Sequence, residues 1–169
     1  MTIAICPGSY DPITFGHIAI IQRASKIFPQ VIVALANNSA KNYLFTDDER
    51  LALARAALAE FPNVSVEFVP GLVAEFAAQA REKSGSEVVL LKGVRDSQDF
   101  VNETTMATVN HNISDIETLI LPTAAKYAHI SSSIVRELAR YGLSITEYVP
   151  EAVAQALREK LTKAKDKQN

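Results

Sequence analysis

Short apolar segments of strand length alternate with segments of helical periodicity along this chain. Runs rich in Val, Ile and Leu predict five strands, at Thr2–Cys6, Val31–Ala36, Val64–Val69, Val88–Lys92 and Ile116–Leu121. Apolar positions at helical spacing predict helices near residues 16–28, 46–60, 72–83, 97–113, 131–141 and 150–164. This alternation predicts an α/β fold, in which a five-stranded parallel sheet is covered by helices on both faces.

Polar and cationic side chains gather where the predicted strands end. Because crossovers between parallel strands are right-handed, a Rossmann-like sheet presents the carboxyl ends of its strands along one edge, where ligands bind. The loops that follow four of the strands carry the candidates Ser9, Thr14, His17, Lys41, Lys92, Gly93, Arg95, Ser131, Ser132 and Ser133. Their convergence on one rim predicts a binding site for an anionic ligand.

The loop between the first strand and the first helix, residues 6–17, has the features of a phosphate site. Gly8 and Gly16 let the backbone approach a ligand closely, and the helix start supplies free N–H groups and a positive dipole end. His17 lies in this loop, where an imidazole can donate to a phosphate oxygen and stabilise charge developing on phosphorus. The alternative is a helix-start histidine without chemistry. Asp11 is expected to cap or orient the loop.

The other candidates each have a simpler structural interpretation. The serine run 131–133 can supply a helix N-cap, for which one hydroxyl is enough, whereas its further hydroxyls suit phosphate. Lys41 can be a solvated loop lysine or reach inward to an anion. Lys92 and Arg95 can form a surface charge pair or hold a triphosphate from the end of an apolar strand. Glu103 alone would be interpreted as part of a solvated helix face.

Composition narrows the classes of protein. The 169 residues are 48% hydrophobic and 21% charged, which indicates one globular domain, residues 1–169, whose polar end after about residue 161 is expected to fray. The net charge of −2 gives no basic field that would recruit nucleic acid or an anionic membrane. A single cysteine excludes an internal disulfide, and no apolar run approaches the length of a membrane span. We therefore expect a soluble, cytoplasmic protein.

Several common site motifs are absent from the sequence. The chain has neither G-x-x-x-x-G-K-[ST] nor G-x-G-x-x-G, which counts against a P-loop kinase and a dehydrogenase. Spacing alone assembles no Ser-His-Asp triad, paired-carboxylate hydrolase site or cluster of metal ligands. No metal-ligating residue is therefore predicted.

Five segments together resemble one known family. The first loop, Pro-Gly-Ser-Tyr-Asp-Pro-Ile-Thr-Phe-Gly-His from residue 7, resembles the T/HxGH signature of the nucleotidyltransferase superfamily. The other four segments are Phe45-Thr-x-x-Glu-Arg50, Gly71-Leu-Val73, Lys92-Gly-Val-Arg-x-x-x-Asp-Phe100 and Ile130-Ser-Ser-Ser. In order and spacing the set is similar to the bacterial phosphopantetheine adenylyltransferases, over residues 2 to about 160.

This resemblance implies a reaction and its partners. The family transfers AMP from ATP to 4′-phosphopantetheine, giving dephospho-coenzyme A and pyrophosphate, with Mg²⁺, in coenzyme A biosynthesis. The acceptor phosphate attacks the α-phosphorus in line, so positioning and charge neutralisation carry catalysis without a covalent intermediate. Magnesium is expected mainly on the substrate phosphates. The resemblance also implies a homohexamer and feedback inhibition by coenzyme A.

The matched positions imply roles for individual residues. Ser9, Lys41 and His17 match the catalytic positions, where the first two hold the acceptor phosphate and His17 steadies the α-phosphate in the transition state. The implied phosphopantetheine site comprises Ser9, Lys41, Leu72, Val73 and Lys92. The implied ATP site comprises Ser9, Tyr10, Gly16, His17, Gly93, Arg95, Glu103, Tyr127, Ile130, Ser131, Ser132 and Ser133.

Three positions depart from the family pattern. Ser9 replaces a usual threonine and lacks the methyl group that stiffens the rotamer, Lys92 replaces arginine, and Asn102 replaces tyrosine. We expect the lysine to weaken or move the contacts to the triphosphate. The sequence leaves open a nucleotidyltransferase with another acceptor, such as nicotinate mononucleotide or glycerol phosphate, and a nucleotide-binding sensor without turnover.

Overall fold

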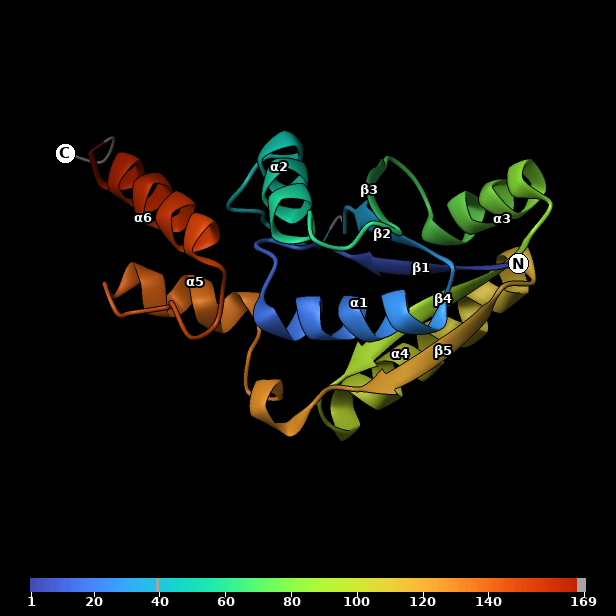
Figure 1. Ribbon diagram of the computed structural model, residues 1–169. Helices are drawn as coiled ribbons and strands as arrows, with labels where there is room; N and C mark the ends of the chain where they lie inside the picture. The colour runs from blue at the N-terminus through green and yellow to red at the C-terminus, as the bar shows by residue number, and fades with distance from the viewer. Residues whose placement is uncertain (39, 167–169) are drawn as a thin grey trace.

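A single parallel sheet forms the centre of the computed structural model, which describes residues 1–38 and 40–166. The strand order is β3-β2-β1-β4-β5 (Figure 1). The strands are β1 (Thr2–Gly8), β2 (Gln30–Ala36), β3 (Val64–Val69), β4 (Glu87–Val94) and β5 (Glu117–Pro122). All four strand pairings are parallel, so the predicted sheet is confirmed, and each strand ends within two residues of its predicted limits.

Helices follow the strands where the apolar periodicity predicts them. They are α1 (Phe15–Ile27), α2 (Asp47–Ala57), α3 (Val73–Ser84), α4 (Ser97–Ser114), α5 (Ser132–Arg140) and α6 (Glu151–Asp166). The 3₁₀ helix η1 (Ala125–Tyr127) is an addition, because a segment this short carries no periodicity. Helix α6 continues to Asp166, since lysine and alanine are good helix formers, and the fraying expected after about residue 161 stays a prediction. Residues 167–169 lie outside the described residues.

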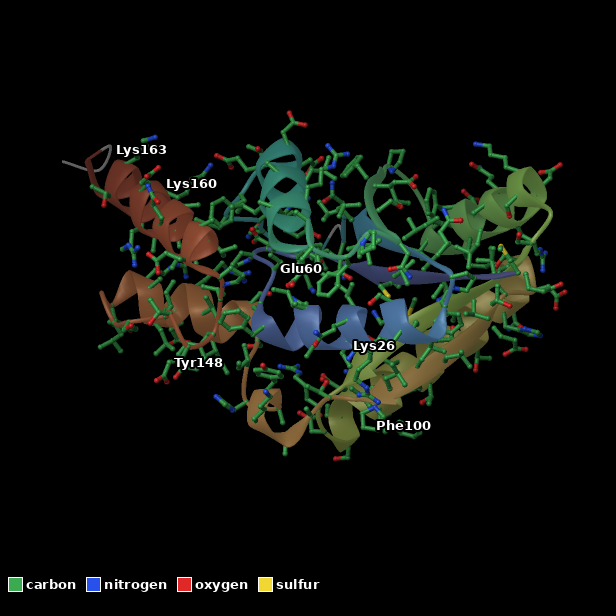
Figure 2. All side chains as sticks on the ribbon, in the orientation of Figure 1. Lys26, Glu60, Phe100, Tyr148, Lys160 and Lys163 are labelled. Atoms are coloured by element: carbon green, nitrogen blue, oxygen red, sulfur yellow. The ribbon has the colours of Figure 1, made fainter. Side chains whose placement is uncertain are left out.

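The two faces of the sheet have separate cores, as the prediction of helices on both faces requires. Side chains alternate along β1, so that Ala4 and Cys6 face one core while Ile3 and Ile5 face the other. Helices α1, α2, α5 and α6 cover the first face, and α3 covers the second (Figure 1). Lys160 of α6, which is labelled in Figure 2, joins two of these helices, because its ammonium donates to the Glu49 carboxylate of α2.

Helix α4 packs beside α3 against β4 and β5, yet none of its residues is buried. Its large apolar side chains face outward, and Phe100 is 49% exposed (Figure 2). The other exposed ones on this helix are Val101, Met106, Val109 and Ile113. Among the described residues, no helix combines the length and the apolar character needed to cross a membrane.

Candidate active site

The predicted rim surrounds a cavity at the point where the strand order reverses. After β1 the chain continues toward the edge strand β3, and after β4 it continues toward the opposite edge strand β5. Ligands of open α/β sheets bind beyond the carboxyl ends of the two strands, here β1 and β4, between which the direction changes. The cavity there has a volume of about 480 Å³. The predicted site residues that line it are Ser9, Tyr10, Gly16, His17, Lys41, Lys92, Gly93, Arg95, Glu103, Ile130, Ser131, Ser132 and Ser133.

Three predicted site residues do not line this cavity. Leu72 is 55% exposed at the N-cap of α3, and Val73 begins that helix, beyond the edge strand β3. Tyr127 ends η1 close by, since its carbonyl oxygen lies 3.8 Å from the position of a Cβ on Gly16. The contacts predicted for these three residues stay predictions.

Tyr10 gives the first loop its shape. Its backbone is in the left-handed region, with φ of 47°, and its hydroxyl donates to the Cys6 carbonyl oxygen at 2.8 Å. The Tyr10 ring then lies against Gly8, where an added Cβ would meet ring carbons at 2.9 Å. Gly8 is therefore required because the ring occupies the space of a side chain.

Asp11 ties the loop to two other segments. Its carboxylate is buried and accepts the backbone N–H groups of Leu44 and Phe45 at 2.9 and 3.0 Å. Arg136 of α5 donates to the same carboxylate at 3.2 Å and also to the Asp11 carbonyl oxygen. Asp11 thus orients the first loop, as expected, and links it to α5 and to the segment before α2.

His17 takes part in an unpredicted capping box at the start of α1. The Thr14 backbone N–H donates to His17 Nδ1 at 3.1 Å, and the His17 backbone N–H donates to the Thr14 hydroxyl. Because Nδ1 accepts a hydrogen bond, the ring hydrogen of neutral His17 is assigned to Nε2. Burial first, and then the charges of Arg95, Lys92 and Lys41, lower the pKa of His17 from 6.5 to about 4. His17 is therefore a neutral hydrogen-bond donor at pH 7.

Ser9 is held from behind by a buried cation. The Arg50 side chain is fully buried, and its NH1 donates to the Ser9 carbonyl oxygen at 2.6 Å. Its NH2 donates to Asn37 and Asp47, so the guanidinium joins the loops after β1 and β2 to α2. This arrangement fixes the backbone of Ser9 beside the cavity.

Three of the cations that line the cavity are paired with carboxylates. Arg95 donates to Asp99 through Nε at 2.7 Å and NH2 at 3.1 Å, and this hydrogen bonding raises the pKa of Arg95 and lowers that of Asp99. Lys92 pairs with Glu103 at 3.1 Å, and the third pair is Arg136 with Asp11. Among the described residues, Lys41 is the lining cation without an ion pair, and it is exposed.

The three serines at the start of α5 make different contacts. Ser131 is the N-cap and accepts from the Ile134 N–H at 3.2 Å, which is the simpler interpretation of the run. Ser132 donates to the Pro12 carbonyl oxygen at 2.8 Å and so connects α5 to the first loop. Ser133 lines the cavity with an exposed side chain. The helix start and its remaining hydroxyl thus line the same cavity as Lys92.

Cys6 lies in the wall of the cavity but lacks the properties of a nucleophile. Its side chain is buried, and burial raises the pKa of the thiol to about 12 against the lowering effect of Lys92. The thiolate is the reactive form of cysteine, and it is scarce at neutral pH here. Cys6 is therefore not a candidate nucleophile in this cavity.

Sequence reasoning missed several lining or supporting residues, and their signals differ. Asp99 lies in the predicted helix 97–113, four residues after Arg95, and this spacing allows the ion pair that the structure shows. Thr14 was a candidate phosphate donor, whereas its hydroxyl caps α1. Tyr43 and Arg136 reach the cavity through tertiary packing alone, and no local sequence pattern indicates this.

Comparisons with known proteins agree with this fold and show the family of the chain. Residues 5–138 match the cytidylyltransferase-like family. A solved structure from Vibrio parahaemolyticus, assigned as a nicotinate-nucleotide adenylyltransferase, superposes with a TM-score of 0.74 over 95% of this chain and 94% of its own, at 17% identity. At that identity the superposition supports the fold alone.

Curated relatives are similar over nearly their whole length. The phosphopantetheine adenylyltransferase of Pseudarthrobacter chlorophenolicus is 46% identical over 93% of this chain and 92% of its own. The enzyme of the same name from Symbiobacterium thermophilum is 46% identical over 96% and 98%, respectively. The chain therefore belongs to the cytidylyltransferase-like family and, within it, to the phosphopantetheine adenylyltransferases.

Proposed function

We propose that this protein transfers AMP from ATP to 4′-phosphopantetheine in the cytoplasm, giving dephospho-coenzyme A and pyrophosphate. The observation that carries the proposal is that His17, Lys41 and the start of α5 line one cavity. The names of the relatives support the choice of both substrates. Coenzyme A biosynthesis is the corresponding process.

The acceptor end of the site is assigned to Ser9 and Lys41. Within residues 1–38 and 40–166 no carboxylate pairs with Lys41, so it need not leave a partner when a phosphate arrives, and its side chain is exposed beside the cavity. The Ser9 hydroxyl lies on the rigid loop that Arg50 holds. Together they can place an acceptor phosphate for in-line attack, which converts a bimolecular step into one of fixed geometry.

The nucleotide end is assigned to His17, Arg95 and the start of α5. The Nε2–H of His17 donates to an oxygen of the α-phosphate, and this hydrogen bond strengthens as negative charge grows there in the transition state. Arg95 and Ser133 take the β- and γ-phosphates, helped by the positive end of α5. Glu103, Tyr127 and Ile130 are assigned to the nucleoside side, and Leu72 and Val73 to the pantetheine arm.

The attack is proposed to be direct, without a covalent adenylyl-enzyme. Support comes from the protonated Cys6 thiol in the cavity wall. A covalent intermediate would let labelled pyrophosphate exchange into ATP in the absence of any acceptor. We expect no such exchange until dephospho-coenzyme A or phosphopantetheine is added.

Mg²⁺ is proposed to enter with the substrate phosphates. Within residues 1–38 and 40–166, no three His, Cys, Asp or Glu side chains come together as a metal site. The donor set therefore does not fit a protein-held ion, whereas Mg²⁺ commonly keeps its waters and binds through phosphates. No step of the mechanism is assigned to a metal-ligating residue of the chain.

A homohexamer is the proposed assembly, and coenzyme A is the proposed feedback inhibitor. The exposed apolar side chains of α4 support association, since patches of this kind mark surfaces that other chains cover. Coenzyme A shares its pantetheine arm with the acceptor, so it would compete for the same cavity. Light scattering of the purified protein tests the assembly.

Mass spectrometry of the product tests the proposed reaction. Protein, ATP, Mg²⁺ and 4′-phosphopantetheine should yield dephospho-coenzyme A. Lys41→Ala should lower the acceptor kcat/KM about 10- to 100-fold, the range for a hydrogen bond to a charged group. Lys160→Ala is the control, because that lysine pairs with Glu49 away from the cavity. A product with another mass would show a different acceptor.

A further inference from the structure

In the part of the chain that the structure describes, the Ser9 hydroxyl has one side-chain neighbour within hydrogen-bonding distance, the hydroxyl of Tyr43. Their oxygens lie 3.4 Å apart, and either can donate. Ser9 belongs to the loop after β1, and Tyr43 to the loop between β2 and α2. Both residues line the cavity, and Lys41 lines it from the same loop as Tyr43. The contact therefore lies at the end of the cavity assigned to the acceptor phosphate.

Tyr43 is itself held in place from two directions. Its hydroxyl oxygen accepts from the Asn38 N–H at 2.5 Å, and its ring lies 4.2 Å below the Arg50 guanidinium carbon. Arg50 also donates to the Ser9 carbonyl oxygen at 2.6 Å. Ser9 is thus contacted at its carbonyl by Arg50 and at its hydroxyl by Tyr43, and these two side chains stack on each other.

The single hydrogen of the Tyr43 hydroxyl has two acceptors. Both the Asn38 carbonyl oxygen and the Ser9 Oγ lie 3.4 Å from the phenol oxygen. When that hydrogen points to Ser9, Oγ accepts it and the serine O–H is free to donate elsewhere. The direction left to the serine hydrogen is toward the cavity, where an anionic oxygen is the strongest acceptor.

We propose that Tyr43 is a positioning residue: it donates to Ser9 Oγ and thereby turns the Ser9 O–H toward the acceptor phosphate. The step is a rotation of two hydroxyl groups, and no bond forms or breaks. A serine hydroxyl otherwise has three staggered rotamers, and a second partner selects one of them. This inference rests on the proposed function, because it assigns an orienting partner to the residue that holds the acceptor.

A double-variant cycle separates orientation from simple packing. Tyr43→Phe keeps the ring under Arg50 and removes only the hydroxyl, so acceptor kcat/KM should fall about fivefold, the effect of one ordinary hydrogen bond. The KM for ATP and the melting temperature should stay unchanged. Ser9→Thr restricts the rotamer by its β-methyl group. In the Ser9→Thr protein, Tyr43→Phe should therefore lower acceptor kcat/KM by less than about twofold.

Tyr141→Phe is the matched control, because Tyr141 is 77% exposed and does not line the cavity. Full acceptor kcat/KM in Tyr43→Phe would overturn the proposal. If Tyr43→Phe lowered acceptor kcat/KM equally in the serine and threonine proteins, the proposal would also be overturned, since the phenol would then act without Ser9. A melting temperature that falls in step with activity would assign Tyr43 to packing instead.

Failure of the proposed substrate can be distinguished from failure of the role proposed for Tyr43. If wild type turns over a different acceptor phosphate, the proposed substrate fails, and the same cycle is measured with that acceptor. If wild type turns over none, binding of inorganic phosphate by calorimetry replaces kcat/KM. Tyr43→Phe should weaken phosphate binding in the serine protein and not in the threonine protein, and equal binding in all four proteins would overturn the inference.

Discussion

The Thr14 backbone N–H donates to Nδ1 of His17 across 3.1 Å, and the His17 backbone N–H donates back to the Thr14 hydroxyl. This reciprocal pair starts helix α1 and fixes the ring at the edge of the cavity. It leaves Nε2–H as the ring donor for a ligand. Helix capping and the chemistry assigned to His17 therefore depend on the same two residues.

The pKa of His17 gives the first prediction. The pKa of His17 is about 4 in the folded protein, against the ordinary value of 6.5 that applies to the unfolded chain. The unfolded chain therefore takes up this proton first as the pH falls. The contribution of His17 to stability is full above pH 6.5 and is lost as the pH falls to about 4. NMR titration of the His17 ring should show this low pKa. The ring signal is assigned as the one that is missing from the spectrum of the His17→Gln variant.

Tripolyphosphate should raise the same pKa, because its charges offset those of Arg95, Lys92 and Lys41, which lower it in the free protein. A pKa of 6.5 or above without ligand would contradict the buried, cation-rich environment of the ring.

Gly93 gives a prediction about packing between β4 and α1. A Cβ at this position would lie 2.8 Å from Cγ1 of Ile20, so Gly93→Ala should lower the free energy of unfolding by about 1–3 kcal/mol through overpacking. Urea denaturation measures the change. Gly71→Ala is the control, since no atom lies within 4 Å of its added Cβ. Equal stability of the two variants would show that α1 has room to move.

Arg136 gives a prediction about the buried carboxylate of Asp11. Asp11 is 2% exposed, so Arg136→Met leaves its charge without a cation and should cost about 3 kcal/mol of stability. Asp11→Asn combined with Arg136→Met should recover part of that loss. Arg140→Met on the same helix is the control, because Arg140 is exposed. An Arg136→Met protein as stable as the control would exclude this link as a support of the loop.

Lys92 gives a prediction about the ATP requirement. Its ammonium pairs with Glu103 at 3.1 Å and lies 3.4 Å from the Pro7 carbonyl oxygen. Lys92→Arg replaces a point charge by a five-donor fork, which can hold a phosphate bidentately. We expect a lower KM for ATP in the variant. An unchanged KM for ATP would show that lysine at position 92 contacts the triphosphate as well as arginine does.

The sheet and its helices were predictable from the sequence because burial imposes a local pattern. Val31–Leu35 is fully buried and reads as an apolar run, and Thr46 with Glu49 forms the expected type of capping box at α2. Such signals lie within a few residues of each other. They also place Ser9, His17, Lys92 and the serine run at strand ends, which predicts one rim.

Contacts between distant segments could not be predicted in the same way. Asp11 and Arg136 are 125 residues apart, and the Tyr43–Ser9 contact joins two loops whose approach depends on the whole sheet. The sequence analysis also did not predict the exposure of α4, a helix in which no residue is buried. The family resemblance named further positions, and the cavity gathers most of them while leaving Leu72, Val73 and Tyr127 outside.

Pyrophosphate release from ATP and Mg²⁺ tests the central claim most directly. Wild type and His17→Ala are assayed with 4′-phosphopantetheine, nicotinate mononucleotide and glycerol 3-phosphate as acceptors. We expect release with phosphopantetheine alone, and a loss of about 100- to 1,000-fold in kcat for the variant, the usual cost of one transition-state donor. ATP should still bind to the variant. Release with a different acceptor, or an unimpaired His17→Ala protein, would contradict the proposed reaction or the role of the histidine.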